Sequence, residues 1–162
     1  MAIQLSDAEI ARLISERKPL PSDYRDCIRT KPKRGHSERE LDVTAVASSE
    51  FRLIFRQSEF NPLDFSVILA YRPPKINQLF RLRRYNGKSH EHTNTLEGET
   101  FYDFHFHIAT ERYQEDSGLR EDTFAQPTDR FADFQGAIKC MLADCGFDVP
   151  ADPQGELFGE ET

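Results

Sequence analysis

Tryptophan is absent from this sequence of 162 residues, and cysteine occurs only three times. An odd number of cysteines is a poor basis for a disulfide framework. Cys140 and Cys145 also lie in one predicted helix, where a spacing of five residues points them to different sides. We therefore expect free thiols, as is usual in a cytoplasmic protein. The 13 phenylalanines are expected to supply most of the large core side chains.

Long apolar runs and several common functional motifs are also missing. No apolar run approaches the roughly 20 residues that a membrane helix needs. The first ten residues lack the basic and apolar stretches of a secretory signal. The motifs GxxxxGK[ST], GxGxxG, HExxH and CxxC do not occur. These absences argue against membrane-spanning proteins, the commonest nucleotide- and dinucleotide-binding classes and the zinc peptidases, and we expect a cytoplasmic protein without a membrane partner.

Charge is distributed unevenly along the chain, whose net charge is −7. Residues 1–90 contain 17 basic and 11 acidic residues, whereas residues 91–162 contain 4 basic and 17 acidic residues. The two halves can neutralise each other in the fold, or the basic segment can attract a polyanion, because the local field steers binding. The length predicts one globular domain over residues 1–147, followed by a mobile acidic tail over residues 148–162.

Helical patterns occur near both ends of this domain. Ser6 and Glu9 fit a capping box at the start of a first helix. Residues 131–145 repeat apolar side chains at helical spacing, and Thr128 or Asp129 can provide the N-cap. We therefore predict one helix before the central part of the chain and one after it.

The central part of the chain shows the alternation that is typical of strands. Residues 65–71 are almost continuously apolar, which predicts a central strand buried on both faces. Residues 102–108 alternate most clearly and place His105 and His107 together on the solvent face. Residues 30–40 are basic and contain proline and glycine, so we expect an exposed loop there. The predicted strands are 41–46, 51–56, 65–71, 79–83 and 102–108.

Four of the five histidines form two His-x-His pairs, His90/His92 and His105/His107, behind a basic segment. Asn86-Gly87 is the strongest short hairpin signal, since both central positions of a type I′ turn need positive φ. A second turn at residues 97–98 would then bring one set of side chains to a common face: Arg81, Arg83, His90, His92, Asp103, His105 and His107. A long polar loop over residues 88–94 fits better, because the opposite face of that segment is too polar to pack on a core.

The chemistry of this region suits phosphate. Arginine binds phosphate oxygens in bidentate geometry, and a histidine pair can serve as general base and general acid in phosphodiester cleavage. We expect phosphate contacts from Arg81, Arg83, Arg84, Lys88 and Arg112. We expect proton transfer from His105 and His107, with His90, His92, Glu111 and Tyr113 as further acid–base groups.

A metal site is the alternative for the same histidines. If a metal binds, its ligands would be His90, His92, His105 and His107, whose nitrogens suit zinc or iron. The neighbouring arginines would repel a divalent cation, and no third ligand occurs at a recognised spacing. We therefore rank a metal below an anion and expect no cofactor.

Two strings in this region carry a resemblance: RLRRYNGKSHEHTN, and FHFHIATERYQ. Together with the segment NPLDFSVIL and the final helix, they resemble a small bacterial and phage-associated family of unknown function, over roughly residues 50–145. The resemblance supplies no activity and no catalytic residue. Its mobile-element setting implies a toxin, an antitoxin or another role in phage–host conflict.

The sequence as a whole predicts an α+β fold, in which an antiparallel meander of four to six strands is flanked by an N-terminal and a C-terminal helix. The leading functional hypothesis is a domain that binds RNA or another phosphate-bearing ligand, with a metal-independent ribonuclease as its enzymatic form. The first alternative is a non-catalytic module that binds a protein partner through its acidic C-terminal half. The second alternative is a metalloprotein with histidine ligands.

Overall fold

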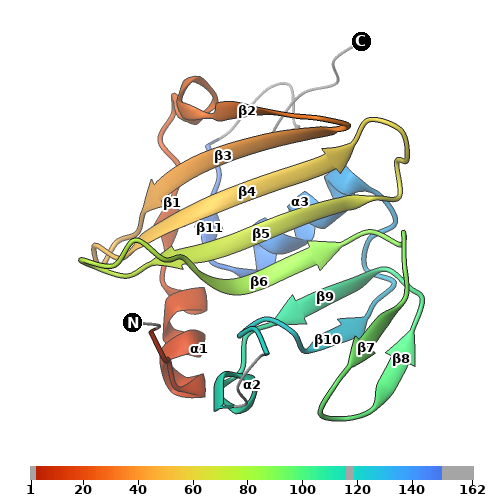
Figure 1. Ribbon diagram of the computed structural model, residues 1–162. Helices are drawn as coiled ribbons and strands as arrows, with labels where there is room; N and C mark the ends of the chain where they lie inside the picture. The colour runs from red at the N-terminus through yellow and green to blue at the C-terminus, as the bar shows by residue number, and fades with distance from the viewer. Residues whose placement is uncertain (1–2, 116–118, 151–162) are drawn as a thin grey trace.

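The computed structural model of the protein, described here for residues 3–115 and 119–150, is built on one seven-stranded antiparallel sheet (Figure 1). The strand order is β10-β9-β6-β5-β4-β3-β2, and the run from β2 to β6 is a continuous meander. The predicted α+β fold is therefore confirmed. The strands are β2 (Arg29–Lys33), β3 (His36–Thr44), β4 (Glu50–Ser58), β5 (Phe65–Arg72), β6 (Phe80–Asn86), β9 (His105–Ile108) and β10 (Ala125–Pro127).

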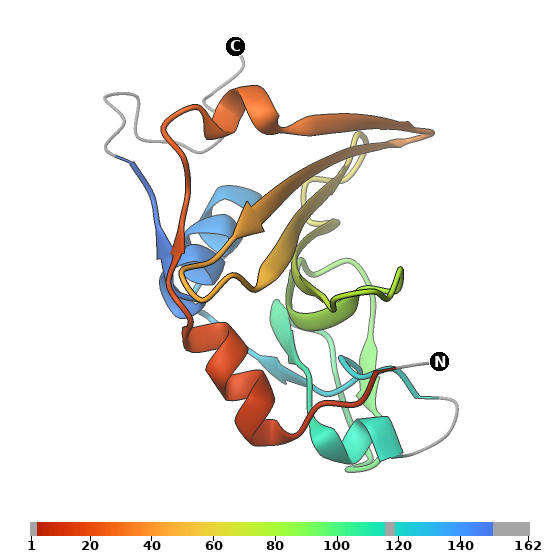
Figure 2. The same cartoon turned by 90° about the vertical axis from the view of Figure 1, so that its left-hand side faces the viewer.

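Two helices cover one face of this sheet. Helix α1 (Asp7–Ser15) and helix α3 (Phe134–Asp144) lie on the same side, as Figure 2 shows with the sheet seen from its edge. The capping box of α1 is present, because the Ser6 side chain accepts the Glu9 N–H and the Glu9 side chain accepts the Ser6 N–H. The face of the sheet opposite these helices is called the open face below, and it is turned toward the viewer in Figure 1.

The N-cap of α3 differs from the prediction. Asp133 caps the helix, and its side chain accepts the N–H of Gly136 at 2.7 Å. Thr128 lies too early, because its own N–H donates to the carbonyl of Phe104 and keeps the chain beside the sheet. Apolar periodicity alone could not separate the last residues of this connection from the first turn of the helix.

The sheet buries its apolar alternation toward the helices. Leu53 pairs with Leu69 in the register of β4 and β5, and both side chains are fully buried in the core. Strand β5 lies at the centre of the sheet and is buried on both faces, as predicted, because Ile68 and Ala70 are buried on the open face. A strand covered on both sides needs apolar residues in nearly every position, and residues 65–71 supply them.

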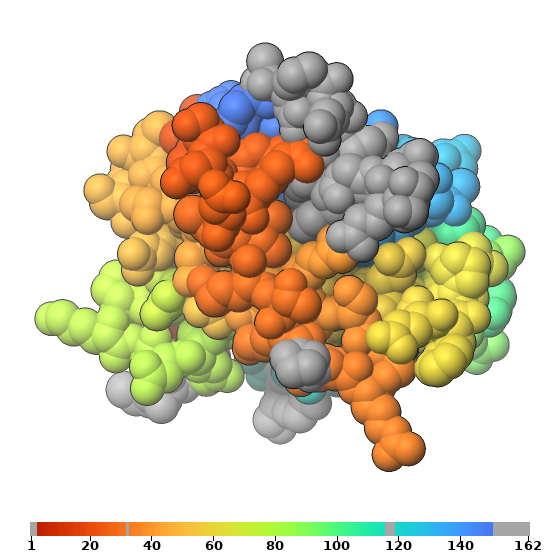
Figure 3. Space-filling view, turned by 90° about the horizontal axis from the view of Figure 1, so that it is seen from above, coloured from red at the N-terminus to blue at the C-terminus, as the bar shows by residue number. Residues whose placement is uncertain are grey.

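Residues 30–40 form a hairpin, so the predicted exposed loop is wrong. Strand β2 pairs with β3 from Arg29↔Glu40 to Lys33↔His36, and Gly35 in the turn has a φ of 78°. The charged alternation of this segment did not reveal a strand, because its side chains pair with one another and do not enter a core. Figure 3 shows this edge of the sheet from above, with β2 and β3 in orange. Lysines on an edge strand discourage pairing with another sheet.

Short elements close the ends of the structure. Strand β1 (Lys18–Pro19) pairs in parallel with β11 (Phe147–Asp148), and the two strands directly follow α1 and α3 along the chain. The buried Lys18 amine donates to the carbonyls of Leu13 and Cys145 at 2.7 Å, which satisfies the carboxyl ends of both helices. The remaining short elements are a 3₁₀ turn (Tyr24–Cys27), β7 (His92–Asn94), β8 (Glu99–Phe101) and α2 (Glu111–Glu115).

Three further predictions concern the cysteines, membrane-spanning helices and the acidic C-terminal tail. The three cysteines all lie in the described part of the chain and are free, as expected. Within the described residues, no helix is both long and apolar enough to span a membrane. Of the predicted acidic tail, Asp148 belongs to β11, and residues 151–162 lie outside the described residues.

Candidate functional site on the open face

The β7–β8 hairpin folds over the end of the open face that β9 forms. The Asn94 amide fixes the hairpin there, because it donates to the carbonyl of Ala125 and accepts the Ala125 N–H, both at 2.8 Å. His105 and His107 project from β9 on this face, but they are only 1% and 3% exposed. The prediction that they lie on a solvent face is therefore wrong, because the β7–β8 hairpin, which forms a separate two-stranded sheet, covers them.

His92 joins the two histidines of β9 from the hairpin. Its ring stacks on that of His105 at 5.4 Å between centroids and meets that of His107 edge-on at 4.8 Å. The rings of His105 and His107 are 5.0 Å apart. The ring of Phe101, in β8, packs against the rings of both His92 and His105. His92, His105 and His107 are called the histidine cluster below.

Each ring of the histidine cluster has one nitrogen held by an oxygen acceptor. Nδ1 of His105 donates to the carbonyl of Asp103 at 2.8 Å, and Nδ1 of His107 donates to the carbonyl of Asp122 at 2.8 Å. Nε2 of His92 donates to Oδ1 of Asn94 at 3.0 Å. These oxygens only accept, so each proton sits on the nitrogen named. In a neutral imidazole the other nitrogen then carries a lone pair.

The buried histidines are neutral at neutral pH. Burial lowers the pKa of His105 to about 4, because the loss of hydration outweighs the hydrogen bond to the Asp103 carbonyl, which raises this pKa. The charge of Arg84 is a further, smaller cause of the lowering. Burial lowers the pKa of His107 to about 2, with Arg84 as the next cause. Neutral imidazoles are Lewis bases, and they are poor proton donors at pH 7.

An internal charge pair borders the cluster. Nε of Arg84 lies 3.4 Å from a carboxylate oxygen of Asp122, which is fully buried. An Arg84 Nη atom is 3.5 Å from Nδ1 of His107, and the Asn86 amide nitrogen is 3.4 Å from its Nε2. Because Asp122 balances the charge of Arg84, the predicted repulsion between this arginine and a cation is offset.

The predicted Asn86-Gly87 turn does not form, although the two histidine segments do meet. Asn86 ends β6, and the Gly87 N–H donates to the carbonyl of Phe65, which continues the contact with β5. A Cβ on Gly87 would lie 1.9 Å from the carbonyl oxygen of Leu63, so glycine is needed there for close packing. The preferred loop over residues 88–94 is correct only in part, since His92 begins β7. His90 remains exposed beside Ser89.

A β-bulge separates two arginines that the sequence placed together. The pairing of β5 with β6 shifts between Leu69 and Ala70, so that Arg81 lies opposite Ala70 and Arg83 lies opposite Leu69. Arg81 therefore lies on the open face, whereas Arg83 reaches the helical side and donates to the Tyr85 hydroxyl at 3.3 Å. Strict alternation cannot reveal a bulge, because the extra residue reverses the faces of all later positions.

The remaining predicted site residues lie apart from the histidine cluster. Lys88 lies over the ring of Tyr102, which is 50% exposed and precedes β9. Arg112 and Tyr113, in α2, both contact the carboxylate of Glu97 at the tip of the β7–β8 hairpin. Glu111 accepts the N–H of Asp7 at the start of α1, which gives it a structural role.

The other half of the open face is a hollow of about 570 Å³ over β2 to β6, called the basic groove below. Its carboxylates lie at the base, where the side chains of Glu38 and Glu40 are 5% and 6% exposed. Their cationic partners Arg56 and Lys31 remain 46% and 49% exposed. The described residues that line the groove include the cations Lys31, Lys33, Arg52, Arg56, Arg81 and Arg120.

The charge of the groove is positive toward solvent. Burial would raise the pKa of Glu40, but the hydrogen bond from Lys31 and the charge of Arg52 outweigh it, so the pKa of this carboxyl is lowered. Glu40 is thus ionised beneath the surface, and the exposed groups above it are cationic. This site was not predicted, because its residues come from the assumed loop over residues 30–40, from β4, β5 and β6, and from the connection after α2. The alternating charges of residues 29–40 were the only signal.

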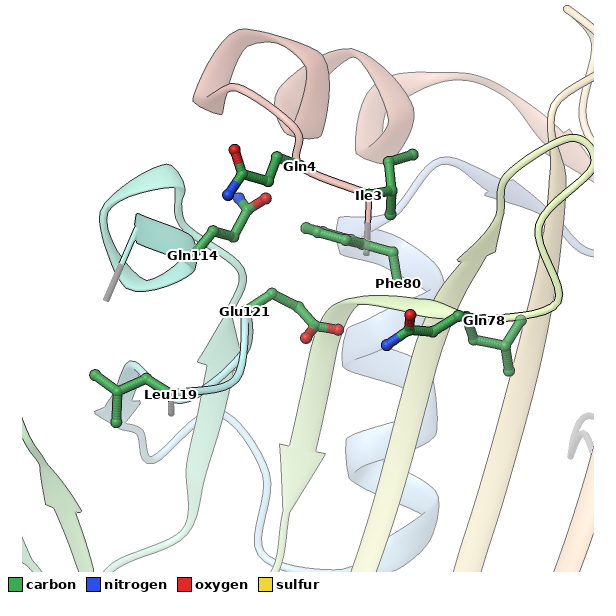
Figure 4. A pocket seen from close by; sticks show the side chains of 8 residues that line it. Ile3, Gln4, Gln78, Phe80, Gln114, Leu119 and Glu121 are labelled. Atoms are coloured by element: carbon green, nitrogen blue, oxygen red, sulfur yellow. The ribbon is translucent and has the colours of Figure 1, made fainter. Parts of the chain in front are cut away.

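A smaller hollow of about 110 Å³ adjoins the groove (Figure 4). The two share Gln78, Leu79 and Glu121, and the Glu121 carboxylate accepts the N–H of Arg81. Figure 4 shows Gln4 and Gln114 beside each other at the other end of this hollow. Glu121 therefore lines both hollows, between the glutamines of the smaller one and the cations of the groove.

Comparisons of the chain with models of protein families, with curated proteins and with solved structures found no match. The resemblance to a bacterial and phage-associated family stays a prediction.

Proposed function

We propose that the protein binds phosphate-bearing polyanions, with RNA as the first candidate, through the basic groove. One observation carries the proposal: Glu38 and Glu40 at the base of the groove are buried, whereas their partners Arg56 and Lys31 are about half exposed. An approaching anion therefore meets guanidinium and ammonium groups before it meets carboxylates. Such a local field can steer a polyanion to a protein whose net charge is −7.

The groove favours contacts with the phosphate backbone. Among the described residues that line it, none is aromatic, so bases have no ring on which to stack. Its apolar floor consists of Ile54 and Ile68, which are buried. Contacts to phosphate carry no base sequence, and their strength falls steeply with salt. We therefore propose binding that depends weakly on sequence and strongly on ionic strength.

Cleavage of bound RNA, with His105 and His107 in proton transfer, is the enzymatic extension of this proposal. It would require the β7–β8 hairpin to open, because both imidazoles are buried. It would also require a rise in their pKa values, which burial lowers to about 4 and about 2. The geometry thus supports binding better than cleavage, and the same experiment can detect both.

The test measures retention of two unrelated single-stranded RNAs at several salt concentrations. The double variant Lys33→Gln/Arg120→Gln removes two exposed cations from the groove. It should reduce the slope of log K against log salt by about 1.4, because each phosphate contact contributes about 0.7 for single strands. The control Arg12→Gln/Lys139→Gln removes two exposed charges from α1 and α3 and should bind like the wild type.

Two outcomes would overturn the proposal: no RNA retention at low salt, or equal weakening in the groove and control variants. A strong preference for one of the two RNAs would contradict recognition through phosphate. Shortened RNA that disappears with His105→Asn would add catalysis to binding. RNA that stays intact with the wild-type protein would leave a binding function alone.

A further inference from the structure

We propose that His92, His105 and His107 bind one divalent transition-metal ion, with zinc as the first candidate, and that this ion fixes the β7–β8 hairpin to β9. This site is separate from the basic groove and does not depend on the function proposed for it. One ring nitrogen of each histidine lies within 4.8 Å of one ring nitrogen of the others. Three neutral imidazoles are a ligand set that zinc uses with a fourth position for water or a small ligand.

The hydrogen bonds of the three rings are those that metal-binding histidines make. A ligating histidine almost always donates its other ring N–H to a carbonyl or carboxylate, which fixes the tautomer and the orientation of the ring. Here His105 and His107 donate to backbone carbonyls, and His92 donates to the Asn94 amide oxygen. The orientation of that amide is itself fixed by its two hydrogen bonds with Ala125.

The second ring nitrogen of each of the three histidines makes few contacts. Among the described residues, Nε2 of His105 and Nδ1 of His92 receive no hydrogen bond. Nε2 of His107 has only the long contact of 3.4 Å with the Asn86 amide, which a metal ion would replace. The lone pairs of these nitrogens are therefore available to a metal ion.

The surroundings of the cluster allow a cation. His105 and His107 are buried and His92 is partly buried, so water competes weakly. The positive charge of Arg84 is balanced by the buried Asp122 carboxylate at 3.4 Å. Nitrogens around tetrahedral zinc lie about 3.4 Å apart, given bonds of roughly 2.0–2.1 Å, so ring nitrogens that now lie up to 4.8 Å apart must approach by up to about 1.4 Å. His92, on the short hairpin, can make this approach.

A metal would therefore join segments that the chain brings together only by folding. The hairpin contributes one ligand and β9 contributes two, so binding should stabilise the closed hairpin. The His-x-His pair of β9 supplies both of its histidines, whereas the pair in the hairpin supplies only His92. His90 is exposed and directed to Ser89, and it provides a matched control within the same sequence motif.

The test uses the full chain, freed of any affinity tag and stripped with a chelator, and titrates it with zinc and with cobalt. We expect one equivalent of zinc per chain, a visible spectrum of tetrahedral cobalt, and a metal-dependent rise in thermal stability. His92→Phe keeps a ring against Phe101 and His105 but removes both nitrogens. It should weaken zinc binding by at least about 100-fold. His90→Ala should leave stoichiometry and affinity unchanged.

The variants also separate failure of the site from failure to fold. His92→Phe should unfold cooperatively, with a transition that zinc no longer shifts. No stoichiometric zinc or cobalt binding by the wild type would overturn the proposal. Unchanged binding in His92→Phe would do the same. Equal loss of binding in His90→Ala would also refute the proposed ligand set.

Discussion

The basic groove and the histidine cluster lie on the same face of one sheet, with Arg84 between them, but solvent reaches them differently. In the groove, long cationic side chains extend above buried carboxylates and remain about half exposed. In the cluster, short imidazoles on β9 lie beneath a hairpin and are almost fully buried. Both halves have strands with polar residues directed away from the helices.

The difference teaches that polarity of a sheet face does not decide its exposure. A lysine or arginine can keep its head group in water while its stem covers the sheet, so the groove needs no further cover. Histidine is too short to do so, and its burial depends on the segment above it. The two halves consequently respond differently to substitution and to pH.

The largest effect is expected at the boundary between the two halves. Asp122→Ala leaves Arg84 without its buried partner and should lower the free energy of unfolding by about 3–5 kcal/mol in urea denaturation. The exposed Asp129→Ala serves as control and should change it by less than about 0.5 kcal/mol. The double variant Arg84→Met/Asp122→Ala should regain part of the loss. A single variant within about 1 kcal/mol of the wild type would show that this pair does not support the covered half.

As the pH falls, the part of the sheet that contains the histidine cluster should be destabilised before the part that forms the basic groove. The folded-state pKa of His105, about 4, lies below its usual value of 6.5, so the unfolded state takes up protons first as the pH falls. This contribution is fully present above about pH 7 and should decrease by about 3 kcal/mol between about pH 7 and 4, by the free energy of about 1.4 kcal/mol per pKa unit.

The measurement is urea unfolding across this range with a chelator present. His105→Gln should flatten the dependence on pH, whereas the exposed His36→Gln should leave it unchanged. Parallel curves for the wild type and His105→Gln would contradict a buried, neutral His105.

A smaller effect on the free energy of unfolding is expected when the β7–β8 hairpin is held less firmly over the histidine cluster. Asn94→Ala removes two hydrogen bonds to the backbone of Ala125 and should lower the free energy of unfolding by about 2 kcal/mol. The pKa of His105, followed by nuclear magnetic resonance, should rise toward 6.5 as water enters. Thr93→Ala, on the exposed side of the same strand, should leave that pKa unchanged. An unchanged pKa in Asn94→Ala would show that other contacts hold the hairpin.

Much of the fold could be predicted from the sequence, because in the central strands the pattern of apolar residues matches the burial of their side chains in the structure. Residues 51–56 and 65–71 were predicted as strands and lie in β4 and β5. The pattern failed where charged residues form a strand, as in residues 30–40. It also failed at the bulge in β6, where one extra residue places Arg81 and Arg83 on opposite faces of the sheet.

The candidate site was predictable only in its components. The two His-x-His pairs are visible in the sequence, and the alternation of residues 105–108 correctly places His105 and His107 on one face. Their burial was not predictable, because it depends on contacts between Asn94 and Ala125, 31 residues apart. The basic groove was missed, since its cations come from four separate segments, β2, β4, β6 and the connection after α2, which only the fold brings together.

The sequence by itself determined that this chain forms an α+β domain with a central antiparallel meander, because apolar periodicity and a capping box act between near neighbours. Only the tertiary structure decided which polar groups face water and which are covered. It joined His92 to His105 and His107, separated Arg81 from Arg83, and placed exposed cations above buried carboxylates. These outcomes depend on strand order, one bulge and the docking of a hairpin, and such non-local contacts leave little trace in local patterns.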